Sequence, residues 1–280
     1  MSAVRAWHKQ NGAHWEGDKD YISLVKTSAH KFTPSSSKHV KCFPVTIEHL
    51  IALDRYLDLQ SGHDCAVSAI AQIAFWSCCH LGELTIPTHN GFDPHRHVAH
   101  SSPVRFADHW DGLRSAHLHI PFGKVERESG ADISVTGWSE LCPVCALQTH
   151  LADNAVVPPD APMFSYVMAG GWVPLTKAVF LQCCKEIWDP VRLSRVSGHS
   201  FCIGGATELL LAGVPPEVVA VQGQWKSLAF LLYWRKLEDL LPLMISRSYD
   251  KSCVEKLCEE FEAYRIHNNL PAVILSAMLL

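Results

Sequence analysis

The residues best suited to chemistry gather in segment 197–235, which reads SGHSFCIGGATELLLAGVPPEVVAVQGQWKSLAFLLYWR. His199 stands at the start of a predicted helix, and Cys202 follows one turn later on the same face. Trp225 comes just after a helix break, and Tyr233 lies eight residues farther on. An imidazole can transfer protons, and a tyrosine hydroxyl can act as a nucleophile. Taken singly, His199 also fits a structural histidine and Tyr233 a core aromatic residue.

Two adjacent glycines, Gly204 and Gly205, stand inside the same predicted helix. Glycine in a helix interior costs about 1 kcal/mol relative to alanine, because it loses more backbone freedom on folding. Such a pair indicates that another backbone or a ligand approaches the helix closely at this point.

Hydrophobic periodicity defines the elements that must position these residues. It predicts helices over 3–10, 46–59, 64–79, 143–154, 175–188, 197–212, 215–222, 226–237 and 253–266. A period of two predicts three short strands at 103–108, 115–122 and 132–136. The expected fold is therefore mainly α with a small antiparallel β-sheet, an α+β arrangement.

Composition restricts the class of protein. The 280 residues are 48% hydrophobic and 19% charged, which is ordinary for a globular protein. No apolar run approaches the ~20 residues of a membrane span, and the first residues lack the apolar core of a secretory signal. Eleven cysteines, some in adjacent pairs within apolar helical segments, favour buried thiols in a reducing intracellular compartment. We therefore expect no membrane partner.

Four ordered motifs resemble those of the tyrosine recombinases, the phage-integrase-like family, and especially the crypton-type recombinases of fungal mobile elements. Segment 198–243 resembles the family's HxxR helix with its following G-x-W and tyrosine. Segment 74–87, AFWSCCHLGELTIP, resembles the first arginine motif, and segment 120–133, IPFGKVERESGADI, resembles the lysine-bearing hairpin. The resemblance covers roughly residues 44–243.

The resemblance assigns a role to each matching residue. Tyr233 would attack a DNA phosphodiester and form a 3′-phosphotyrosyl link. His199 and Trp225 would hydrogen-bond the phosphate, and Lys124 would protonate the leaving 5′-oxygen. The phosphotyrosyl link stores the bond energy for rejoining, so this chemistry needs no metal and no cofactor. The implied partner is double-stranded DNA.

This chain departs from the family pattern at both arginine positions. The first holds His80, within CCHLGEL, and the second holds Cys202, within HSFC. Two arginines would hold the charged transition state by bidentate contacts, which neither histidine nor cysteine can reproduce. No arginine nearby in sequence is an obvious substitute; Arg192, Arg195 and Arg235 are the nearest. The active site is therefore expected to be degenerate.

Three regions are expected along the chain. Residues 1–42 form a basic arm, the remnant of a DNA-clamping helical domain, with seven Lys or Arg against three Asp or Glu. Residues 43–250 form the catalytic-like domain, and residues 251–280 a docking helix with an apolar tail. That helix would join copies of the chain on DNA, or pack on its own chain. A nuclear location follows, with phosphate contacts expected from Lys31, Lys38, Lys41 and Arg235.

Two other classes of function stay open. One is a domesticated DNA-binding or protein-interaction module without recombinase chemistry. The other is a His/Cys metal-binding protein, for which two segments qualify. Cys142 and Cys145 form a CxxC with His150 nearby, but a second pair at zinc-finger spacing is missing. The richer set is a histidine-rich stretch that reads otherwise as a polar loop and strands: His89, His95, His97, His100, His109, His117 and His119.

We expect this chain to relax supercoiled plasmid DNA very slowly or not at all. Removing one donor to a developing oxyanion typically lowers a rate by ~10²–10³, and two charged positions are changed here. Plasmid relaxation needs no known target site, and the wild type is compared with Tyr233→Phe. Robust relaxation that Tyr233→Phe abolishes would show that other residues have taken over from the two arginines.

Overall fold

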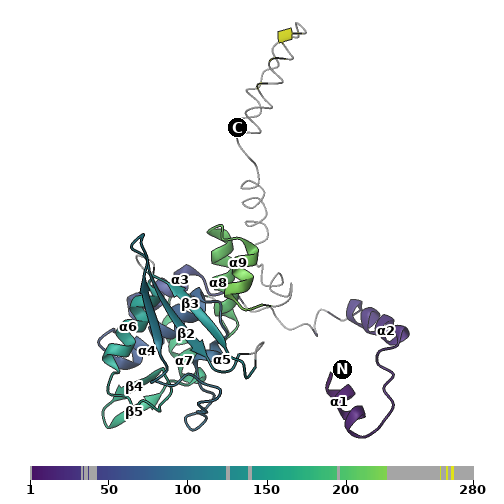
Figure 1. Ribbon diagram of the computed structural model, residues 1–280, viewed down its shortest axis with the longest axis horizontal. Coiled ribbons are helices and arrows are strands. Elements are labelled where there is room, and N and C mark those ends of the chain that lie inside the picture. Colours follow the sequence, from purple (N-terminus) through teal and green to yellow (C-terminus); the bar gives the residue numbers. More distant parts are fainter. Residues whose placement is uncertain are drawn as a thin grey trace. The chain divides into compact units, whose positions relative to one another are not determined.

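The computed structural model describes residues 2–32, 34, 37, 43–123, 127–137, 141–193, 196–225, 259, 263, 266 and 267. The chain divides into two compact units, Met1–Lys41 and Cys42–Leu280 (Figure 1). No helix among the described residues is long and apolar enough to cross a membrane. The docking helix predicted for 253–266 and the helix predicted for 226–237 lie outside the described residues, apart from the single positions 259, 263 and 266.

The first unit contains two helices, α1 (Ser2–Gln10) and α2 (Asp20–Lys31). The first confirms the helix expected at 3–10. The second was not expected, because Lys19 at its N-cap makes no side-chain capping bond and its apolar residues do not form a clear stripe. An ion pair of 3.0 Å between Arg5 and Asp18 joins α1 to the segment before α2.

The second unit is built mainly from helices, as the periodicity predicts. They are α3 (Ile47–Tyr56), α4 (Gly62–Trp76), α5 (Leu81–Leu84), α6 (Pro143–Asp153), α7 (Lys177–Trp188), α8 (Ser200–Leu211) and α9 (Pro216–Gln222). Of these, the one-turn helix α5 was not predicted. Two of their ends follow from local chemistry. The Thr176 hydroxyl accepts a hydrogen bond from the Val179 N–H at the start of α7, and Pro216 opens α9 where its missing N–H costs nothing.

Helix α4 forms the centre of the core. Every residue from Cys65 to Phe75 is buried, in agreement with a helix that is apolar on all sides. It contacts α3, α6, α8, β3 and β4. The helix ends at Trp76, earlier than predicted, because Cys78 adopts a positive φ of 53° and turns the chain out of the helical path.

Two small antiparallel sheets complete the second unit (Figure 1). Strands β1 (Val104–Asp108), β2 (Arg114–Ile120) and β3 (Ala131–Thr136) pair in that order, close to the predicted bounds. Strands β4 (Ser165–Met168) and β5 (Gly171–Pro174) form a separate hairpin that was not predicted, because four residues are too few to show an alternating pattern. The expected class, mainly α with small antiparallel sheet, is confirmed.

The glycine pair of α8 makes the close approach that the sequence predicts, and the approaching groups are backbone. A Cβ on Gly204 would overlap the carbonyl oxygen of Val45, and a Cβ on Gly205 would overlap the carbonyl oxygen of Phe75. Val45 N–H also donates to the Ser200 carbonyl at 2.9 Å. Helix α8 therefore lies directly against the end of α4 and the segment before α3.

We expect Gly205→Ala to destabilise the fold by about 3 kcal/mol, because the added methyl group meets rigid backbone rather than a movable side chain. Gly82→Ala is the matched control, since a Cβ there meets nothing within 4 Å. Urea unfolding followed by circular dichroism measures both changes. Equal midpoints for the two variants would contradict the packing of α8 on α4.

Candidate functional site

A surface depression with a volume of about 390 Å³ brings together residues from five separate segments of the second unit. They come from α5 and the residue before it, the loop before β1, the turn after β2, the start of α7 and the two residues before α8. The lining consists of His80, Leu81, Gly82, Glu83, Arg96, Phe122, Lys177, Gly198 and His199. Two of the six predicted catalytic residues, His80 and His199, are among them.

The imidazole rings of His80 and His199 are in contact in this depression. Their ring centroids lie 5.4 Å apart with an interplanar angle of 70°, an edge-to-face contact. His80 immediately precedes α5, and its backbone N–H donates to the Glu83 carboxylate at 2.9 Å. His199 precedes α8 and is exposed. Residues from two motifs far apart in sequence therefore meet at one point.

Arg96 places a guanidinium in the same depression. Its central carbon lies 4.5 Å above the Phe122 ring, a cation–π contact. The Arg96 backbone N–H donates to the Asp93 carbonyl at 2.9 Å, which fixes the loop that carries it. No described residue forms an ion pair with its exposed guanidinium. Sequence reasoning missed Arg96, because a single arginine in a polar loop carries no periodic or motif signal.

Lys177, the first residue of α7, supplies a second cation. A Cβ on Gly198 would lie 2.9 Å from the Lys177 ammonium nitrogen, so glycine at 198 leaves the room that the lysine occupies. Lys177 was not predicted either, since a lysine at a helix start usually faces solvent. Arg96 and Lys177 carry two permanent positive charges beside two imidazoles and the single carboxylate of Glu83. This arrangement suits an oxyanion.

The other predicted catalytic residues lie elsewhere. Cys202 is fully buried, and its thiol donates to the His199 carbonyl at 3.1 Å, so it lies under the His199 turn without lining the depression. Trp225 packs on Gly223 and on a small cluster that includes Cys78 and Leu210. This placement fits a packing role for Trp225. The hydrogen bond from Trp225 to a phosphate stays a prediction.

The turn before Trp225 nevertheless approaches the depression. A Cβ on Gly123, the residue after Phe122, would lie 3.8 Å from a Glu83 carboxylate oxygen and 3.9 Å from the Gln224 side-chain oxygen. The predicted lysine hairpin, first arginine motif and G-x-W turn thus converge here. Tyr233, Lys124, Lys38, Lys41 and Arg235 lie outside the described residues, while Lys31 ends α2 in the first unit and is exposed.

The cysteines and histidines behind the two metal hypotheses have structural roles in the described chain. Cys142 caps α6, its sulfur accepting from the Cys145 N–H at 3.2 Å. His150 is buried, its Nε2 bonds the Met163 carbonyl at 3.0 Å, and burial lowers its pKa to about 4.

In the histidine-rich stretch, His117 forms hydrogen bonds with Ser115 and Ser134, and His119 forms one with Asp132. None of its histidines belongs to a group of three possible ligands within the described chain.

Comparison with known proteins gives structural neighbours only. No protein-family model matches this chain, and no curated protein matches it. Among solved structures it is similar to a Flpe–Holliday junction complex, with a TM-score of 0.40 and 10% identity over 76% of this chain and 53% of that one. A FLP recombinase–Holliday junction complex matches with a TM-score of 0.40 and 11% identity, over 76% and 53% of the two chains. The chain thus spans about half the length of these proteins.

We expect Cys202→Arg to destabilise the protein by at least about 3 kcal/mol, because it places a guanidinium where the present side chain has no solvent contact. Cys202→Ala is the control and is expected to cost about 1 kcal/mol, the loss of one small buried group. Urea unfolding measures both. Stability of Cys202→Arg close to that of Cys202→Ala would mean that the arginine reaches the depression, and would contradict the expectation.

Proposed function

We propose that this chain is a DNA-binding protein of the tyrosine recombinase type whose strand-transfer chemistry is impaired. The observation that carries the proposal is the meeting of His80 and His199 with Arg96 and Lys177 in one depression. His80 and His199 belong to sequence motifs that imply contact with a phosphate. Arg96 and Lys177 supply the positive charge that such a contact needs.

A DNA phosphodiester fits this depression by charge and by hydrogen bonding. It carries one negative charge on two non-bridging oxygens. A guanidinium can bond both oxygens in parallel, and an ammonium adds a point charge. The imidazoles of His80 and His199 offer further N–H donors. Glu83 brings one negative charge, but its carboxylate already accepts the His80 backbone N–H at 2.9 Å.

The same geometry supports impaired chemistry. The two arginine positions hold His80 and Cys202, and Cys202 is buried away from the depression. Arg96 restores one guanidinium from a different segment, stacked on Phe122. One guanidinium holds a phosphate in the ground state, whereas strand transfer needs charge stabilisation that increases in the transition state. Binding is therefore retained more fully than cleavage.

The proposal includes the remaining roles assigned by the resemblance. Tyr233 is the residual nucleophile and Lys124 the proton donor to the leaving oxygen. The basic residues Lys31, Lys38 and Lys41, with Arg235, add phosphate contacts that are independent of base sequence. The proposed origin is a crypton-type element, and the proposed site of action is nuclear DNA, with copies of the chain joined through the helix predicted at 253–266.

Duplex DNA of random sequence tests the depression directly. We expect Arg96→Ala and Lys177→Ala each to weaken binding about fivefold, because each removes one phosphate contact. Each should also reduce the slope of log Kd against log salt by about one. Fluorescence anisotropy across a series of salt concentrations gives both quantities.

Two exposed cations serve as matched controls for these variants. Lys185 lies on α7 with Lys177, and Arg55 lies on α3; neither lines the depression. Lys185→Ala and Arg55→Ala should leave affinity within about twofold of the wild type. Equal losses in all four variants would assign binding to general surface charge, and unchanged binding by Arg96→Ala and Lys177→Ala would contradict a phosphate site in the depression.

A further inference from the structure

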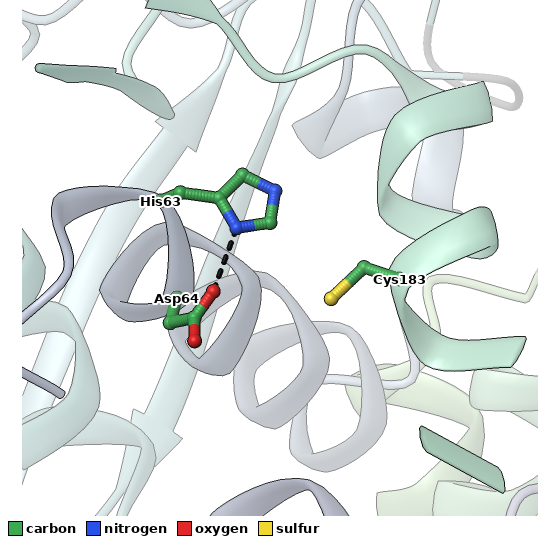
Figure 2. A group of neighbouring side chains, drawn as sticks. All are labelled: His63, Asp64 and Cys183. Carbon is green, nitrogen blue, oxygen red and sulfur yellow. Dashed lines mark hydrogen bonds and ion pairs between the residues drawn. The ribbon is translucent and has the colours of Figure 1, made fainter. Parts of the chain in front are cut away.

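Three metal-binding side chains meet at a place that the proposed phosphate site does not use. His63 and Asp64 belong to the first turn of α4, and Cys183 belongs to α7. One possible ligand atom from each lies within 4.8 Å of the other two, and all three side chains are half-buried. Figure 2 shows the Cys183 thiol pointing toward the imidazole and the carboxylate, which share a hydrogen bond of 2.7 Å.

We propose that His63, Asp64 and Cys183 form a zinc-binding site that links the start of α4 to α7. Imidazole nitrogen, thiolate sulfur and carboxylate oxygen are the three donor types that Zn²⁺ takes in proteins. Mg²⁺ and Ca²⁺ prefer all-oxygen sets, so the thiol selects for zinc or a similar transition metal. Three protein ligands leave a fourth position for water.

Zinc binding would require only a small movement of the three side chains. Ligand bonds of about 2.0–2.3 Å in a tetrahedron place ligand atoms about 3.3–3.8 Å apart. The His63–Asp64 pair must therefore open by about 1 Å from its hydrogen bond, and the thiol must approach by a similar amount. Rotation about side-chain bonds supplies displacements of this size without backbone change.

The surrounding contacts already orient two of the ligands. The second carboxylate oxygen of Asp64 accepts the Asp58 N–H at 2.9 Å, which leaves the first oxygen directed at His63. The Tyr166 ring stands edge-to-face against the His63 ring, with centroids 4.9 Å apart. Outer contacts of this kind fix ligand orientation and raise metal affinity.

The charge around the cysteine favours a cation. Burial raises the pKa of the Cys183 thiol to about 11, and the negative charges of Asp64 and Glu186 add to that shift. The same two carboxylates would attract a divalent cation to this place.

Cobalt(II) is the probe for this site, since a cobalt–thiolate bond absorbs in the near ultraviolet. The whole chain, freed of metal and kept reduced by a phosphine, is titrated with Co²⁺ and then with Zn²⁺. We expect one equivalent of Co²⁺ to produce the thiolate band and Zn²⁺ to remove it. Zinc should also raise the unfolding temperature of the wild type.

Variants identify the ligands. Cys183→Ser should abolish the band, and His63→Ala should weaken Co²⁺ binding at least about tenfold, since even outer-contact changes cost that much. Cys145→Ser is the matched control, because among the cysteines that the structure describes Cys145 is the exposed one and so the most open to adventitious metal. Circular dichroism without metal verifies that each variant is folded.

Three outcomes would overturn the proposal. They are a band that survives Cys183→Ser, a band that Cys145→Ser removes, and no stoichiometric binding by the folded wild type. None of them bears on the phosphate site, because His63, Asp64 and Cys183 do not line that depression.

Discussion

The contact of two glycines with bare backbone determines where the candidate phosphate site lies. Gly204 and Gly205 allow α8 to rest on the carbonyl groups of Val45 and Phe75, an approach that any side chain would prevent. This contact holds the N-terminal end of α8, and therefore His199, beside the chain that leaves α4. His80 lies four residues after the end of α4, so the same contact places the two imidazoles against each other. Everything else in the depression is added around this pair.

Charge in the depression comes from segments that have no role in that helix contact. Arg96 is held over Phe122 by a loop, and Lys177 depends on the absence of a side chain at Gly198. A site assembled in this way can attract a phosphate without an arginine at position 80 or 202, because ground-state attraction depends mainly on net charge. Transition-state stabilisation depends on donors at fixed positions, which a guanidinium on a loop supplies less well. The proposed division between binding and cleavage follows from this difference.

Sequence pattern predicted the parts of the molecule whose causes are local. The all-apolar helix α4, the three strands of the larger sheet and the glycine contact of α8 each follow from residue type and spacing. The family resemblance implies one site for His80 and His199, and their rings are in contact. Arg96 and Lys177 could not be found this way, since only the tertiary fold brings them to the histidines. The same reason hid His63, Asp64 and Cys183, whose ligand set spans two helices and forms no motif. Cys202 matched a motif position, yet its burial depends on neighbours that spacing does not specify.

The two proposed sites occupy opposite ends of one helix, and this separation limits what the metal can do. His63 and Asp64 lie in the first turn of α4, whereas His80 follows its last turn. Fifteen helical residues rise by about 22 Å along α4, whereas on α7 Cys183 follows Lys177 by only six residues, about 9 Å of helix rise. The three zinc ligands do not line the depression, so the ion would not contact a phosphate held by Arg96 and Lys177. Its effect on the phosphate site must therefore act through stability: linking α4 to α7 stiffens the two elements that carry His80 and Lys177. Zinc should then change the unfolding temperature strongly and the intrinsic affinity for DNA only weakly.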